Sequence, residues 1–214
     1  MNEARLLWRP APDRAAATRL EAFRRAVQDR FGEDLPDYDA LHAWSLRENA
    51  RFWAFYAAWA GLELPPPQEV VSSAPMPHTA WFAGTTLNYA QKLLEPSGAL
   101  TAASALVAAT ETGARLEVSR AELRALTARC AGALRRAGVG PGDRVAAFAC
   151  TLPEVIVALL AASSLGATFA SCSPDFGLEA AHARFGQIAP KVLFGSPLYF
   201  YGGKRFDTSS TLQG

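Results

Sequence analysis

The sequence has few residues of the kinds that build disulfide frameworks or metal sites. It has three histidines and three cysteines, and the cysteines are Cys130, Cys150 and Cys172. An odd number of widely spaced cysteines fits neither a disulfide framework nor a zinc-binding spacing. We therefore expect free thiols, no metal site, and a reducing compartment, for which the cytoplasm is the default.

The chain also lacks an excess of charge of either sign. Its 21 Lys and Arg residues nearly balance its 20 Asp and Glu residues, which gives a formal net charge of +1. Binding to nucleic acids or to anionic membranes depends largely on basic side chains that contact phosphates. We therefore expect neither nucleic acid nor membrane as a partner, and the sequence carries no signal that sets an oligomeric state.

One long stretch is almost free of charge. Between Val145 and Pro174 the only charged residue is Glu154. A membrane-spanning helix needs about 20 apolar residues, but Pro153 suits the start of a helix here and Gly166 suits its end. Two buried strands that flank an apolar helix explain the stretch better, because parallel strands are covered on both faces.

Tryptophan is absent from the second part of the chain. All five tryptophans lie within the first 81 residues, and the rest is rich in Ala, Val and Leu. The ranges 15–31 and 42–61 carry apolar and aromatic residues at helical spacing, and Ser45 and Glu48 have the spacing of a capping box. We expect a helical N-terminal segment over residues 1–98, whose aromatic residues form a helix core rather than an aromatic ligand cage.

The second part alternates expected strands and helices. Strands are expected at 105–110, 115–118, 144–150, 167–172 and 191–194, and helices at 120–137, 153–165 and 178–188. Repeated strand–helix–strand units favour right-handed crossovers and a mainly parallel sheet. We therefore predict an α/β fold, with part of a doubly wound, mainly parallel sheet over residues 99–207.

Two glycine-rich stretches do not meet the requirements of known phosphate loops. The run from Gly138 to Gly142 follows an expected helix and precedes a strand, the reverse of the order in dinucleotide-binding folds. The pair Gly203-Lys204 lacks the upstream glycine and the following Ser or Thr of a Walker loop. The three histidines stand in no recognisable catalytic or zinc motif, so we assign no catalytic residue and no metal ligand.

Two short stretches remain as candidate ligand loops. Residues 171–177 follow an expected strand and precede a helix, where backbone N–H groups favour an anion. Phe176 suits stacking on a base, and the alternative is a plain helix cap made by Ser173 or Asp175. The run 199–205 places aromatic residues beside two cations, which suits a phosphate or nucleotide but equally suits a surface loop.

Several stretches resemble one family of enzymes. Residues 81–90, Trp-Phe-Ala-Gly-Thr-Thr-Leu-Asn-Tyr-Ala, resemble a signature of acyl-CoA synthetases close to acetyl-CoA synthetase. Residues 171–177, 184–194 and 201–205 look specifically like the acetoacetate–CoA ligase branch of the adenylate-forming superfamily. Residues 7–10 and the segment from 37 to 59 are similar to the leading helices of that branch.

The resemblance implies a two-step reaction. ATP and acetoacetate give acetoacetyl-adenylate and pyrophosphate, and the thiol of coenzyme A (CoA) then displaces AMP. ATP, CoA and magnesium are the cofactors that the resemblance implies, and acetoacetate is the acid substrate. It also implies six residues that bind the nucleotide end of CoA: Ser173, Pro174, Asp175, Phe176, Lys204 and Arg205.

The sequence departs from the family pattern in what it lacks. It contains no Ser/Thr/Gly-rich phosphate loop ending in lysine, and no match to the adenine and ribose contacts or to the C-terminal domain. The resemblance ends near Asp207, so we expect a non-family tail at 208–214. We expect the N-terminal part of an acetoacetate–CoA ligase, inactive by itself because the groups that stabilise charge on the reacting phosphoryl centre are missing.

Two alternatives stay open at this point. The chain fits the N-terminal part of another short-chain acyl-CoA synthetase, because the acid pocket of this superfamily lies mostly downstream. It also fits a non-catalytic CoA- or nucleotide-binding module, or a remnant of an enzyme.

Overall fold

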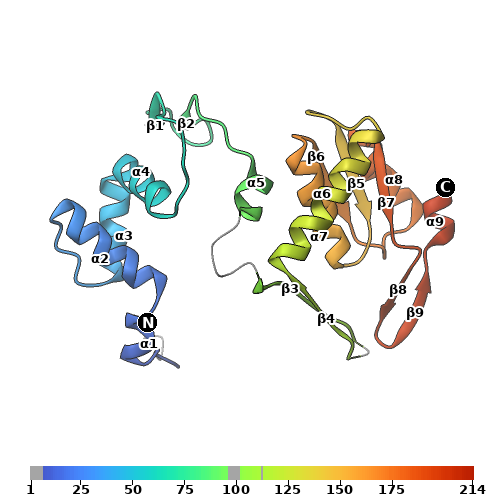
Figure 1. The fold of residues 1–214 in the computed structure, drawn as a ribbon, viewed down its shortest axis with the longest axis horizontal. Coiled ribbons are helices and arrows are strands. Elements are labelled where there is room, and N and C mark those ends of the chain that lie inside the picture. The colour runs from blue at the N-terminus through green and yellow to red at the C-terminus, as the bar shows by residue number, and fades with distance from the viewer. Residues whose placement is uncertain (1–6, 96–101, 112) are drawn as a thin grey trace, which may run out of the picture. The chain divides into compact units, whose positions relative to one another are not determined.

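A computed structural model describes residues 7–95, 102–111 and 113–214. The chain divides into two compact units, one ending at Leu87 and the other beginning at Asn88 (Figure 1). The boundary expected between residues 98 and 99 lies outside the described residues, so the predicted division into domains stays a prediction. Each unit is described by itself.

The first unit is mainly helical. Its elements are α1 (Pro12–Ala16), α2 (Arg19–Phe31), α3 (Tyr38–Arg47), α4 (Asn49–Trp59) and the short antiparallel strands β1 (Glu69–Val71) and β2 (Trp81–Ala83). The side chain of Thr18 caps α2 by accepting the N–H of Glu21, and Gly32 ends it with a left-handed φ of 68°. The predicted helix over 15–31 is therefore confirmed, with a later start.

The core of the first unit consists of buried aromatic and aliphatic side chains from its helices. It contains Phe23, Val27, Leu35, Leu41 and Trp44, and the indole of Trp44 is fully buried. The ring of Phe23 lies 5.1 Å from that of Trp59 and 5.7 Å from that of Phe55. The aromatic density of this region is thus a helix core, as the spacing predicts.

One helix prediction for the first unit is wrong. Instead of a single helix over 42–61, the chain forms α3 and α4 with a break at Glu48. Ser45 does not cap a helix, because its hydroxyl donates to the carbonyl of His42 within α3. The cap of α3 is Asp37, which accepts the N–H of Ala40. The aromatic residues keep their helical spacing across Glu48, so the sequence pattern does not predict this break.

The second unit is an α/β structure. Its elements are α5 (Tyr89–Leu94), β3 (Ser104–Ala109), β4 (Arg115–Ser119), α6 (Arg120–Arg136), β5 (Arg144–Phe148), α7 (Pro153–Ser164), β6 (Thr168–Cys172), α8 (Leu178–Ile188), β7 (Val192–Gly195), β8 (Leu198–Tyr201), β9 (Lys204–Asp207) and α9 (Ser209–Gln213). Strands β5, β6 and β7 form a parallel sheet in the order β6-β5-β7, while β3–β4 and β8–β9 are antiparallel hairpins (Figure 1).

Helices cover both faces of the parallel sheet. Val145 of β5 packs in a cluster with residues of α6 and α7, whereas Phe148, three residues later, packs with Ala181 of α8. Residues at odd separation along a strand point to opposite faces, so the two clusters lie on opposite sides of the sheet. This arrangement confirms the predicted α/β fold with a doubly wound, mainly parallel sheet.

The nearly uncharged stretch from Val145 to Pro174 is a strand–helix–strand unit. It contains β5, α7 and β6, as the sequence predicts. In the part of the chain that the structure describes, no helix combines the length and the apolar character needed to cross a bilayer.

Candidate functional site

Both candidate loops begin at the carboxyl-terminal end of the parallel sheet. Phe148 at the end of β5 is paired with Cys172 of β6 and with Gly195 of β7. Because the strands are parallel, the loop that begins at Ser173 and the segment that begins at Ser196 both start at the carboxyl ends of the strands. Open α/β sheets bind their ligands at the carboxyl ends of their strands. The two segments start on opposite sides of β5.

The first loop is a tight connection from β6 to α8. Pro174 is buried, while Ser173 and Asp175 are exposed. The N–H of Phe176 donates to the carbonyl of Ser173 over 3.4 Å. The alternative that Ser173 or Asp175 caps the helix is wrong, because α8 is capped by Gly177 with no side-chain hydrogen bond. Both polar side chains therefore remain directed to solvent, where a ligand can reach them.

Phe176 is partly buried and has a cationic neighbour. Its ring packs beside the buried cluster of Phe148, Cys172 and Ala181, and the guanidinium of Arg184 lies 4.0 Å from the ring centroid. Cation–π contacts at exposed positions contribute about 0.5–1 kcal/mol, so Arg184 favours this position of the Phe176 ring. Arg184 is not among the site residues predicted from the sequence, although its place about two helical turns into α8 is visible in the helical spacing.

The second candidate stretch is a regular β-hairpin rather than a surface loop. Residues 198–201 pair with 204–207, and Gly202 and Gly203 form the two-residue turn, with φ values of 58° and 73°. Two successive left-handed residues are required by the turn type that fits the twist of a hairpin, and glycine adopts this conformation at little cost. The surface-loop alternative for this stretch is therefore wrong.

The hairpin places its two cations on different faces. Lys204 is paired with Tyr201, and Arg205 is paired with Phe200. Because neighbouring residues of a strand point to opposite faces, Lys204 shares a face with Tyr201 and Arg205 does not. Both cations are exposed. A single phosphate bound on one face of the hairpin would therefore contact one of the two cations.

The two cations also differ in their electrostatic surroundings. The hydroxyl and backbone N–H of Ser209 hold the pKa of the Asp207 carboxyl below its usual range, and Arg205 contributes to this lowering. Among the described residues, neither the ammonium group of Lys204 nor the guanidinium of Arg205 has a hydrogen-bond or ion-pair partner. Both cations are therefore available to an anion, and the charge of Arg205 is partly offset by Asp207.

Titratable groups near the first loop do not suggest a nucleophile. Burial raises the pKa of the Cys172 thiol, so at neutral pH it stays in the weakly nucleophilic thiol form. Within the described ranges, no group of three or more His, Cys, Asp or Glu side chains is placed to hold a metal ion. A cavity of about 290 Å³ lies between α8 and α9, and none of the six predicted CoA-binding residues lines it.

Comparison with protein-family models places two matches on the chain. Residues 100–212 match the AMP-binding enzyme family, and residues 38–93 match the N-terminal region of acetyl-coenzyme A synthetase. The first match includes most of the segment 208–214, which the sequence analysis sets apart as a tail. In the structure this segment contributes Leu212 to the packing around Phe148.

Individual relatives match nearly the whole chain. The acetoacetyl-coenzyme A synthetase of Rhizobium meliloti (strain 1021) is 37% identical over 100% of this chain and 32% of its own length. The acetoacetyl-CoA synthetase of Rattus norvegicus is 36% identical over 99% of this chain and 31% of its own. The malonamoyl-CoA synthetase of Penicillium aethiopicum is 32% identical over 93% of this chain and 28% of its own.

A solved structure matches the fold. The acetoacetyl-CoA synthetase from Streptomyces lividans has a TM-score of 0.91 and 37% sequence identity over 98% of this chain and 33% of its own. The chain thus spans about a third of the length of the relatives that it matches. It belongs to the family of AMP-binding enzymes, and acetoacetyl-CoA synthetases are among its homologues.

Proposed function

We propose that the chain is the N-terminal part of an acetoacetate–CoA ligase, which converts ATP, acetoacetate and CoA to AMP, pyrophosphate and acetoacetyl-CoA. The observation that carries the proposal is the likeness to the acetoacetyl-CoA synthetase from Streptomyces lividans, at 37% identity over almost the whole chain. The three free cysteines suit a reducing cytoplasm, where we place the protein.

ATP and magnesium are cofactors of the proposed complete reaction, but we assign them to no residue of this chain. The described residues offer no cluster of carboxylates that suits magnesium. The sequence also has no glycine-rich loop followed by lysine that would bind the phosphates of ATP. We therefore derive no step of adenylate formation from this part of the protein.

The contribution of this chain is to bind the nucleotide end of CoA. Lys204 supplies an exposed, unpaired ammonium group, which suits the 3′-phosphate. Asp175 is exposed and acidic, so it suits a hydroxyl or amino group of the adenosine rather than a phosphate. Ser173, Pro174 and Phe176 shape the same loop, and Arg205 lies on the other face of the hairpin.

Calorimetry with CoA and with dephospho-CoA tests this proposal. We expect CoA to bind more tightly than dephospho-CoA, because only CoA carries the 3′-phosphate. Lys204→Ala should weaken CoA binding by about ten-fold or more, the usual loss for one charge-assisted hydrogen bond, and should leave dephospho-CoA binding almost unchanged. Arg205→Ala removes the same charge from the opposite face of the hairpin, so we expect it to weaken CoA binding less than Lys204→Ala does.

Two results would contradict the proposal. If the wild-type chain binds no CoA at millimolar concentration, this part of the protein does not form the CoA site. If Lys204→Ala and Arg205→Ala weaken CoA and dephospho-CoA equally, the hairpin attracts anions only through its net charge.

A second candidate concerns the acid substrate. The malonamoyl-CoA synthetase of Penicillium aethiopicum is 32% identical to this chain, only a few per cent less than the acetoacetyl-CoA synthetases. Malonamate and acetoacetate are both short acids with a second carbonyl group, so an active site for one is close in shape to an active site for the other. Rates of adenylate formation with the two acids, measured on a protein that contains the acid pocket, distinguish these candidates.

A further inference from the structure

The turn of the β8–β9 hairpin is held by a carboxylate from a distant part of the second unit. The N–H groups of Gly202 and Gly203 donate to the two carboxylate oxygens of Glu111 over 3.1 and 3.2 Å. Glu111 lies in the connection between β3 and β4, about 90 residues earlier in the chain. Figure 1 shows the tips of the two hairpins side by side.

In this contact, the two backbone donors and the two carboxylate acceptors match in number. The two glycine N–H groups lie in the turn, outside the ladder that pairs residues 198–201 with 204–207. Successive N–H groups in a turn of left-handed residues form a concave donor site for an anion. A carboxylate has two acceptor oxygens, so Glu111 satisfies both donors at once. Because a charged acceptor is involved, these hydrogen bonds are stronger than those between neutral groups.

We propose that Glu111 is a positioning residue for the CoA site: it fixes the Gly202–Gly203 turn and with it the backbone of Lys204, the next residue. The inference rests on the proposed function, because it concerns the same site. A turn that is fixed before the ligand arrives need not be ordered on binding, so less of the binding free energy is lost.

Simple electrostatics predicts the opposite effect of removing this carboxylate. Glu111 is an anion close to a site proposed for an anionic ligand, so its charge by itself weakens phosphate binding. Neutralising it would then strengthen CoA binding. A positioning role predicts weaker binding, so the direction of the change separates the two explanations.

The test compares Glu111→Gln with Glu117→Gln in the full 214-residue chain. Glutamine has one acceptor oxygen and places an NH₂ group against the second turn N–H. Glu117 lies on β4 and forms an ion pair with Arg115 at 2.8 Å. Its replacement removes the same charge from the same hairpin but leaves the turn contact in place, which makes it a matched control.

Amide hydrogen exchange, resolved by NMR, measures the contact itself. We expect the amides of Gly202 and Gly203 to exchange about ten-fold faster in Glu111→Gln, as loss of a hydrogen bond to a charged group implies, and at the wild-type rate in Glu117→Gln. Unchanged exchange in Glu111→Gln would show that the carboxylate does not hold the turn, and would overturn the inference.

Calorimetry with CoA measures the positioning effect. We expect Glu111→Gln to weaken CoA binding by about two- to ten-fold, the range expected when one segment must be ordered on binding. In the Lys204→Ala background the same change should have no effect, because the group that is positioned is gone. Equal or tighter binding by Glu111→Gln, or an undiminished effect in the Lys204→Ala background, overturns the inference.

Failure of the proposed function gives a different result. If the wild-type chain binds no CoA, there is no CoA site for Glu111 to organise, and the exchange rates of Gly202 and Gly203 still report whether Glu111 holds the turn.

Discussion

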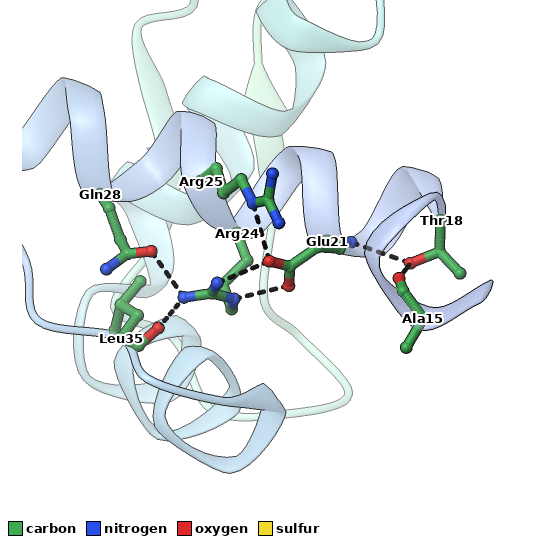
Figure 2. A network of polar contacts seen from close by, with 7 residues as sticks. All are labelled: Ala15, Thr18, Glu21, Arg24, Arg25, Gln28 and Leu35. Atoms are coloured by element: carbon green, nitrogen blue, oxygen red, sulfur yellow. Dashed lines mark hydrogen bonds and ion pairs between the residues drawn. The ribbon is translucent and has the colours of Figure 1, made fainter. Parts of the chain in front are cut away.

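Glu21 and Arg24 form the centre of a hydrogen-bond network in the first unit (Figure 2). Arg24 donates to both carboxylate oxygens of Glu21, at 2.7 and 2.8 Å, and Arg25 adds a further hydrogen bond of 2.8 Å. Arg24 also reaches the side chain of Gln28 and the carbonyl of Leu35. The network therefore ties α2 to the segment that follows it. The hydrogen bonds from Arg24, and then that from Arg25, lower the pKa of Glu21 to about 2.

This lowered pKa predicts a pH-dependent loss of stability in Glu21→Gln. In the unfolded chain a glutamate has a pKa of about 4.3, so ionised Glu21 stabilises the folded state fully above that pH. The contribution is lost as pH falls from there toward 2. We expect the variant to be less stable than the wild type at pH 7 and nearly equal to it at pH 2.

Urea unfolding at several pH values, followed by tryptophan fluorescence, measures this difference, since all five tryptophans lie in the first unit. The control is Glu33→Gln, because Glu33 forms a more exposed ion pair with Arg47 at 3.2 Å and such pairs contribute little. A stability difference between wild type and Glu21→Gln that is the same at pH 7 and pH 2 would contradict the prediction.

The sequence predicts only part of this residue-level detail. The spacing of Glu21, Arg24 and Arg25 on one helix indicates that they can meet, but nothing local indicates that Arg24 reaches Leu35. The same limit applies to Lys204 and Arg205. Their charge and neighbourhood are visible in the sequence, whereas their opposite directions follow from a hairpin that the sequence analysis does not predict.

At the scale of elements, α6 begins with a capping box. The hydroxyl of Ser119 accepts the N–H of Glu122, while the Glu122 carboxylate accepts the N–H of Ser119. The spacing of Ser119 and Glu122 in the sequence, a Ser followed three residues later by a Glu, predicts this capping box, and the structure confirms it. The hydrogen bonds from Ser119 also lower the pKa of Glu122, because they favour the ionised carboxylate.

Ser119→Ala should destabilise the second unit by about 1 kcal/mol, the typical value for loss of an N-cap side chain. Urea unfolding followed by far-UV circular dichroism measures the change. Ser45→Ala is the matched control, because Ser45 also stands three residues before a glutamate but donates to His42 within a helix. We expect it to change stability by less than about 0.5 kcal/mol. Equal effects of the two substitutions would be incompatible with a capping role for Ser119.

Elements with strong periodicity and clear ends are predictable from this sequence. Helix α8 is predicted at its observed bounds, because an apolar stripe runs from Leu178 to Ile188. The hairpin β8–β9 is not predicted, since its Tyr, Phe, Lys and Arg residues do not alternate between apolar and polar and its strands are stabilised by pairing with each other. The stacked rings of Tyr199 and Phe206, 5.0 Å apart, illustrate such a cross-strand contact.

At the scale of the whole molecule, the chain matches only one part of the enzymes that it resembles. It spans about a third of the length of its relatives, and it has no phosphate loop in its sequence. Enzymes that transfer phosphoryl or nucleotidyl groups depend on such loops and on cations to stabilise the charge that develops on the phosphorus centre. Under the proposed function, this chain would bind CoA, and the groups that act on the phosphorus centre would lie in parts of the enzyme that the sequence does not contain.

We accordingly expect the purified 214-residue chain to show no acetoacetate-dependent exchange of labelled pyrophosphate into ATP. The complete acetoacetyl-CoA synthetase from Streptomyces lividans is the positive control, and a reaction without acetoacetate is the blank. Exchange above the blank, in a preparation free of other synthetases, would mean that these 214 residues contain an ATP site without a glycine-rich phosphate loop.

The strand order β6-β5-β7 also has a consequence for how the second unit assembles. Arg144 is paired with Thr168, and Val145 with Val192, so the second pairing closes a loop about twice as long as the first. Each doubling of loop length raises the entropic cost of closure by about 0.6 kcal/mol. Chain connectivity therefore favours formation of the β5–α7–β6 unit before β7 adds to the other side of β5.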